Sequence, residues 1–243
     1  MSFYGGARTL YARSIKIAQK GKTVSGLSRI DYLLFGIIAV TFLGAGFVAV
    51  TDPQAFSLRY AAEDGLVEYM TAVFLLVSAF VLWGHTRRAA LWRPALLLGF
   101  YGLLFFFAAG EEISWGQRIF DLQPNEFFME NNKQAEITLH NLVVADVSLA
   151  SFLFGNVLTV TLLMYLVVLP LMYPRFAWVQ AFVRALMVPV PKPVHALITL
   201  VMTAIVLWID LPRQWEVYEA GFSVLALSIF LNPANVELFR SGV

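Results

Sequence analysis

Residues 30–50 read IDYLLFGIIAVTFLGAGFVAV, an almost unbroken apolar run. A helix needs roughly 20 mostly apolar residues to cross the hydrocarbon layer of a bilayer. Five further stretches come close to that length, at about 65–84, 91–110, 148–172, 194–210 and 215–232. The sequence therefore predicts an all-α fold, a polytopic membrane helical bundle of about six transmembrane helices.

The composition supports a membrane location. Hydrophobic residues make up 59% of the 243 residues and charged residues 14%, which is too apolar for a water-soluble globule. The absence of cysteine excludes disulfides, thiolate zinc sites and a cysteine nucleophile. A net charge of +1 does not indicate nucleic-acid binding, and membrane lipids are the expected partners.

Acidic residues lie mostly on one side of the predicted bundle, and basic residues lie mostly on the other. Fourteen of the 16 acidic residues lie on one side, and 13 of the 17 basic residues lie on the other. The positive-inside rule places the basic side, with both termini, in the cytoplasm. These basic residues are Arg8, Arg13, Lys16, Lys20, Lys22, Arg29, Arg87, Arg88, Arg93, Arg175, Arg184, Lys192 and Arg240.

The predicted organisation has three parts: a basic cytoplasmic segment at 1–29, the bundle at 30–232 and a short cytoplasmic tail at 233–243. The first part lacks the compact apolar run and cleavage site of a secretory signal, so we expect it to stay in the mature protein. Aromatic and apolar residues interrupt two connections, at 113–147 and 174–193. We expect interfacial helices there, lying on the membrane surface.

Acidic residues gather at the predicted outer ends of the helices. Three of them, Asp64, Glu136 and Glu216, are explained as first-turn residues that face water, because a helix dipole stabilises anions at its N-terminus. Glu111 and Glu112 are not explained in this way. They end a predicted span, where the dipole repels anions, so another group must compensate their charge.

Glu68 and Glu219 lie deeper than the other outer acids, because too few residues follow each of them to cross a bilayer. An acid at such depth normally faces the bundle interior or a wet cavity and marks a functional site. We therefore expect Glu68, Glu111, Glu112 and Glu219 to converge as metal ligands or on a shared proton. Oxygen ligands with at most one imidazole favour Mg, Mn or Ca.

A possible acid–base pair follows in the same loop. Glu136 and His140 are four residues apart, and a helix would place them on one face. His140 is the one histidine predicted on the outer side. We expect Glu136 and His140, together with Glu112, to be catalytic, with a structural role for the histidine as the alternative.

The segment GEEISWGQR (110–118), followed by LHN (139–141), resembles a signature of uncharacterised multi-pass bacterial inner-membrane proteins. The resemblance implies location in a bacterial inner membrane and no particular activity. It also implies that Trp115, Gln117, Arg118 and Asn141 act as one unit with the acids and with His140.

The residue types in this unit suggest roles. We expect Trp115, Gln117, Arg118 and Asn141 to contact substrate, with Arg118 paired to a carboxylate or to a substrate phosphate. Trp115 in the interfacial aromatic belt is the alternative. The two glycines have different predicted uses, because Gly110 permits close helix approach and Gly116 permits a sharp turn.

Three functions are compatible with these features. The first is a divalent-metal-dependent membrane hydrolase or transferase that acts on lipid or lipid-linked substrates from the outer face. The second is an accessory or assembly subunit of a larger membrane complex, with the acids forming a polar network or a docking surface. The third is a proton- or cation-coupled carrier, which is disfavoured because no charged residue is predicted mid-span on the inner half.

Overall fold

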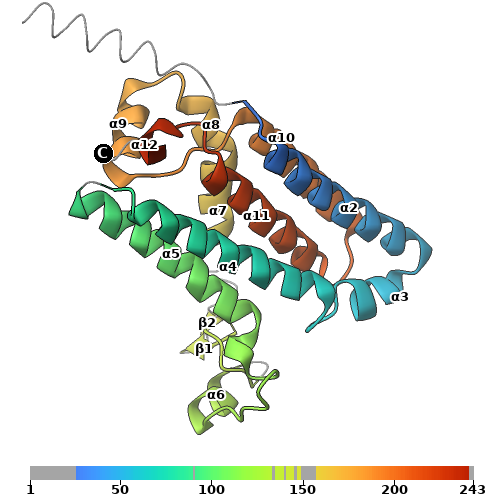
Figure 1. Cartoon of the computed structure of the whole chain (residues 1–243). Coiled ribbons are helices and arrows are strands. Elements are labelled where there is room, and N and C mark those ends of the chain that lie inside the picture. The colour runs from blue at the N-terminus through green and yellow to red at the C-terminus, as the bar shows by residue number, and fades with distance from the viewer. Residues whose placement is uncertain are drawn as a thin grey trace, which may run out of the picture.

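The computed structural model describes residues 26–89, 91–132, 135–139, 141–144, 147–148 and 157–240. The architecture is all-α (Figure 1), and one antiparallel pair of two-residue strands lies in a loop. Three helices, α2 (Arg29–Thr51), α4 (Leu66–Thr86) and α5 (Trp92–Glu112), are long and apolar enough to cross a membrane. Their bounds agree with the predictions for 30–50, 65–84 and 91–110.

The other predicted spans are largely helical where they are described, but they are shorter or less apolar, and the predicted start of the fourth, Ser148, lies in a strand. The fourth continues through α7 (Leu158–Leu163), a π-helical turn (Met164–Val168) and α8 (Leu169–Met172). The fifth and sixth are α10 (Pro193–Ile209) and α11 (Gln214–Leu231). Smaller elements are α3 (Pro53–Ala55), a π-helical turn (Phe56–Tyr60), a 3₁₀ turn (Ser114–Gly116), α6 (Glu126–Asn131), β1 (Val143–Val144), β2 (Val147–Ser148), α9 (Ala177–Leu186) and α12 (Glu237–Arg240).

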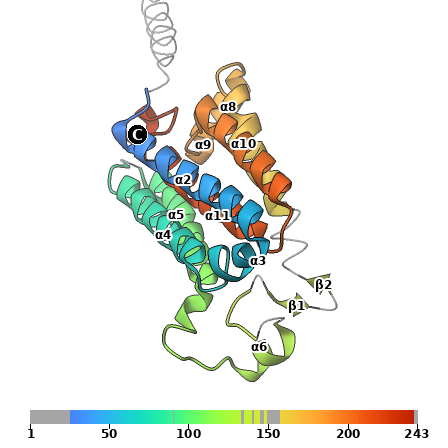
Figure 2. The ribbon, with the colours of Figure 1, turned by 90° about the vertical axis from the view of Figure 1, so that its right-hand side faces the viewer.

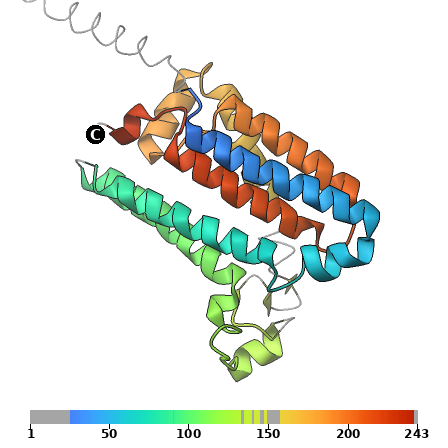
Figure 3. The same cartoon turned by 45° about the vertical axis from the view of Figure 1, so that its right-hand side comes forward.

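Helix α11 is the centre of the bundle, and every residue from 223 to 230 is buried. Helices α2, α4 and α10 pack around it, and α5 packs on α4 (Figure 3). The outward side of α2 exposes Val40, Leu43 and Phe47, each at about 70%. A stripe of large apolar side chains on this scale has to be covered, and lipid covers it if the helix spans a bilayer.

The two predicted interfacial segments differ in outcome. Helix α9 lies within 174–193 and ends at Met187, whose φ of 54° is left-handed. The expected helix over 113–147 is wrong for most of that segment, since its described residues hold the 3₁₀ turn, α6 and the strand residues of 143–147. Pro124 and the left-handed residues Asp121 and Ala135 prevent a longer helix.

The bundle has two chemically different ends. The acidic end carries Glu63, Asp64, Glu68, Glu112, Glu216 and Glu219 at the starts of α4 and α11 and the end of α5. The loop with α6, β1 and β2 extends from this end (Figure 2). The basic end carries Arg87, Arg88, Arg93, Arg175 and Arg184 near the α4–α5 turn and α9, on the side of the C-terminus (Figure 1).

Candidate functional site

The segment that follows the apolar part of α5 folds back on its own helix. Ser114, Trp115 and Gly116 are left-handed in succession, with φ of 48°, 53° and 76°. This conformation costs about 1 kcal/mol or more at each residue other than glycine. The turn lays the Trp115 ring over Gly110, where a Cβ would stand 2.8 Å from the ring. The predicted sharp turn at Gly116 is confirmed, whereas Gly110 is approached by the Trp115 ring of the same chain and not, as predicted, by another helix.

Glu111 is compensated by this fold. Its carboxylate accepts a hydrogen bond from Trp115 Nε1 at 2.7 Å and another from the Leu139 backbone N–H at 2.7 Å. The residue is 5% exposed. These donors offset the unfavourable helix dipole at the end of α5, so Glu111 holds the loop to the helix and is not free to bind a metal.

Gln117 and Arg118 extend the connection to the loop and to α4. Gln117 accepts from the Ile137 backbone N–H at 2.7 Å. Arg118 donates to the carboxylates of Asp64 and Glu136, and Glu63 lies 3.7 Å away. Burial lowers the pKa of Arg118, but the hydrogen bond to Asp64 and the charges of Glu136, Asp64 and Glu63 together raise it above its ordinary value. Arg118 is therefore held in place as a cation, and its guanidinium is already paired with carboxylates of this chain.

Glu136 is also a scaffold residue. It is 4% exposed and accepts from Arg118 and from Asn141 Nδ2, the latter at 3.2 Å. Its segment is not helical, so the helical spacing expected for Glu136 and His140 is wrong. His140 itself lies outside the described residues.

Glu112 differs from its neighbours because its carboxylate makes no hydrogen bond or ion pair within the described part of the chain. The same is true of Glu219, which is exposed on α11. Four carboxylates act on Glu112 with their negative charges, those of Glu219, Glu216, Glu68 and Glu111 in decreasing order. The sequence explained Glu216 as a first-turn acid that faces water, and its position three residues before Glu219 predicted that both lie on one side of α11.

The predicted metal ligands do not assemble as one set. Among the described residues, no three or more histidine, aspartate or glutamate side chains are grouped closely enough to hold a metal ion. Glu111 turns toward the loop, and Glu68 accepts from the Asp64 backbone N–H at 2.7 Å, at the start of its own helix. Glu112 and Glu219 are left as the two carboxylates of the predicted set without such partners.

A second polar cluster, the Asp31 cluster, joins three helices at the basic end. Asp31 on α2 is fully buried and accepts from Ser228 Oγ and Asn232 Nδ2, both at 2.6 Å. Lys192 Nζ lies 3.6 Å from Asp31 Oδ2. His195 on α10 is buried with its Nε2 3.0 Å from Ser228 Oγ. Burial lowers the pKa of Lys192, and the Asp31 carboxylate opposes this shift.

The serine, histidine and aspartate of this cluster do not form a catalytic triad. The Lys192 backbone N–H donates to His195 Nδ1 at 2.9 Å, so the ring proton is on Nε2. Nε2 then donates to Ser228 Oγ, and the serine hydroxyl donates to Asp31. A histidine in this tautomer cannot take the serine proton, so Ser228 is not an activated nucleophile. The Asp31 cluster holds α2, α10 and α11 together.

Sequence reasoning missed the Asp31 cluster, although one signal was available. Asp31 is one of two acidic residues on the predicted basic side, the other being Glu237. An acid in the first turn of an apolar helix, on the side where cations gather, needs a nearby partner.

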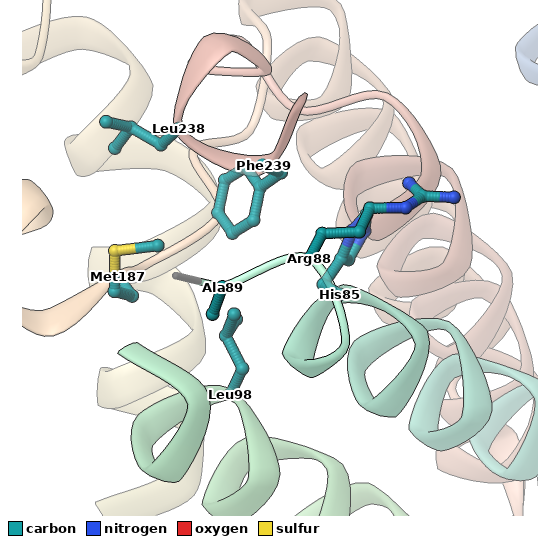
Figure 4. Close-up of a pocket in the computed structure, with 7 residues that line it drawn as sticks. All are labelled: His85, Arg88, Ala89, Leu98, Met187, Leu238 and Phe239. Atoms are coloured by element: carbon teal, nitrogen blue, oxygen red, sulfur yellow. The ribbon is translucent and has the colours of Figure 1, made fainter. Parts of the chain in front are cut away.

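A small cavity also lies at the basic end (Figure 4). Its volume of about 10 Å³ is room for roughly one water molecule. His85 Nδ1 is buried there without a hydrogen-bond partner among the described residues. The cavity is too small for a substrate, and its lining residues are His85, Arg88, Ala89, Leu98, Met187, Leu238 and Phe239.

Comparisons of the chain with protein-family models, with curated proteins and with solved structures found no match. The site is therefore interpreted from its own geometry.

Proposed function

We propose that this protein is a multi-pass membrane enzyme in which Glu112, opposed by Glu219, is the acid–base group for a lipid or lipid-linked substrate. One observation carries the proposal. The charged neighbours of Glu112 in the segment 110–118 are each held by specific partners, whereas Glu112 has none within the described residues. A strained turn and a set of ion pairs thus fix the residues around Glu112, but they do not neutralise its carboxylate.

The membrane placement is part of this proposal. We assign six spans to α2, α4, α5, the helical segment 157–172, α10 and α11. The arginines of the basic end place that end and both termini in the cytoplasm of a bacterial cell, by the positive-inside rule. The acidic end then faces outward. Trp115 and Trp215, both partly exposed there, suit the interfacial region in which aromatic rings are enriched.

The chemistry follows from two carboxylates that repel each other, neither of which forms an ion pair with a described residue. A single proton held by Glu112 and Glu219 relieves that repulsion. Such a pair can accept a proton from an attacking hydroxyl and return one to a leaving group. Glu219 is exposed, so a substrate in the outer leaflet has access to the pair from the side of α11.

The test compares cells that express the wild-type chain, Glu112→Gln or Glu130→Gln, with matched amounts of protein in the membrane. Glu130 is an exposed acid on α6 and is the control. Lipids and lipid-linked intermediates are measured by mass spectrometry, with and without a chelator of divalent cations. We expect one lipid or lipid-linked intermediate whose abundance changes in cells that express the wild type or the control, but not in cells that express Glu112→Gln. Equal profiles for wild type and Glu112→Gln would refute the assignment.

One observation favours the accessory-subunit alternative. The loop of the acidic end exposes the apolar side chains of Ile119, Phe120 and Phe127, each more than half exposed. These side chains enter the interface of the bilayer or dock on another protein. Purification in mild detergent distinguishes docking on a protein from insertion in the bilayer. An accessory subunit should copurify with a stoichiometric partner, and the partner should be lost when Phe120 is replaced by Ser.

A further inference from the structure

Helix α9 has three distinct sides. Val179 and Val183 are buried against the bundle. The adjoining side exposes Trp178 at 63% and Phe182 at 54%. Because successive helical residues are about 100° apart, the third side carries the residues at 177, 180, 181, 184 and 185. A helix with one face on the protein, one apolar face exposed and one polar face lies in the plane of a membrane interface.

A shallow, open groove of about 380 Å³ lies along the third side. Alanine side chains leave this room, and two longer polar side chains stand in it. Gln180 donates to the Tyr173 carbonyl at 2.9 Å, whereas the guanidinium of Arg184 has no hydrogen bond or ion pair to another described residue. The lining residues are Ala177, Gln180, Ala181, Arg184 and Ala185.

The groove lies at the basic end, where arginines outnumber acids, although the charge of Glu237 reaches Tyr173 together with that of Arg184. The described residues of the basic end expose five arginines, at 87, 88, 93, 175 and 184. Of the acids on that side, Asp31 is buried beside Lys192, and Glu237 has a partner of its own. The groove is therefore complementary to an anion, and the exposed Trp178 and Phe182 beside it are complementary to an acyl chain.

We propose that the groove on α9 binds an anionic phospholipid of the adjoining leaflet. The phosphate pairs with the guanidinium of Arg184, which can donate two parallel hydrogen bonds to it. The acyl chain lies along Trp178 and Phe182. The inference rests on the membrane placement given under the proposed function but not on the activity of Glu112.

The test uses the full chain in a detergent micelle, titrated with phosphatidylglycerol or phosphatidylcholine and observed by native mass spectrometry. We expect the wild type to retain phosphatidylglycerol in preference. Arg184→Gln should lower that retention about five-fold, equivalent to about 1 kcal/mol for one arginine near an anionic lipid. Arg59→Gln is the matched control, because Arg59 is exposed near the acidic end, and it should leave retention unchanged.

A second measurement needs no arginine substitution. In liposomes that contain phosphatidylglycerol with brominated acyl chains, tryptophan quenching should exceed that with brominated phosphatidylcholine, and the excess should disappear in Trp178→Phe. High salt should reduce the excess, because it screens the headgroup charge.

Several outcomes would overturn the proposal. Equal retention of the two lipids, an equal loss in Arg59→Gln, or quenching that does not depend on Trp178 would each do so. A dimer that is lost in Ala181→Leu would assign the groove to a second copy of the chain instead. Glu112→Gln should retain phosphatidylglycerol normally, so the failure of one proposal is distinguishable from the failure of the other.

Discussion

Removal of the Asp31 carboxylate should destabilise the bundle more than the loss of one ordinary hydrogen bond. Asp31→Asn keeps the size of the side chain but leaves Lys192, which is 2% exposed, as a buried cation without its counter-ion at 3.6 Å. Breaking a buried ion pair in this way costs about 3–5 kcal/mol. Lys192→Met should cost less, about 1–3 kcal/mol, because Ser28, Ser228 and Asn232 still donate to Asp31.

The double variant is the decisive sample. With both charges removed, neither side chain is left as an uncompensated ion, so the loss should fall short of the sum of the single losses by about 2 kcal/mol. The free energy of unfolding is measured in detergent micelles by circular dichroism, with the exposed Glu130→Gln as a control that should stay within about 0.5 kcal/mol of wild type. Single losses that add up within about 0.5 kcal/mol would show that Asp31 and Lys192 do not stabilise each other.

Three further predictions concern the acidic end and the orientation of the chain. Arg118→Gln should cost about 1–2 kcal/mol, discounted because the side chain is 35% exposed, and should speed proteolysis of the loop; an unchanged cleavage rate would contradict its role as a tie. Gly110→Ala should displace the Trp115 ring, and the emission of Trp115 should shift relative to that of wild type; an identical spectrum would show that the close approach is not required. The chain has no cysteine, so single cysteines at Glu130 and Arg175 report topology directly. An impermeant thiol reagent added outside intact cells should label the first and not the second, and the reverse pattern would invert the proposed orientation.

The features predicted correctly from the sequence are those that depend only on residues adjacent in the chain. The apolar runs that became α2, α4 and α5 were recognised because the length of a hydrophobic stretch is a property of consecutive residues. The need for glycine at Gly116 was recognised for the same reason, since a sharp turn is predicted from adjacent residues. The helix dipole predicted that Glu111 and Glu112 need a compensating group, and the structure provides hydrogen-bond donors for Glu111, while the role of Glu112 stays a prediction.

Only the tertiary structure decided which charged groups meet. The partners of Arg118 include Asp64, which is 54 residues away, and Asp31 is held by Ser228, which is 197 residues away. The periodicity of the sequence does not predict such pairs, because they depend on how separate helices pack. The same limit explains why Glu111 was expected beside Glu112 at one site. Adjacent residues on a helix point about 100° apart, and the fold of the following loop decided that the Glu111 carboxylate is hydrogen-bonded while the Glu112 carboxylate has no such bond to a described residue.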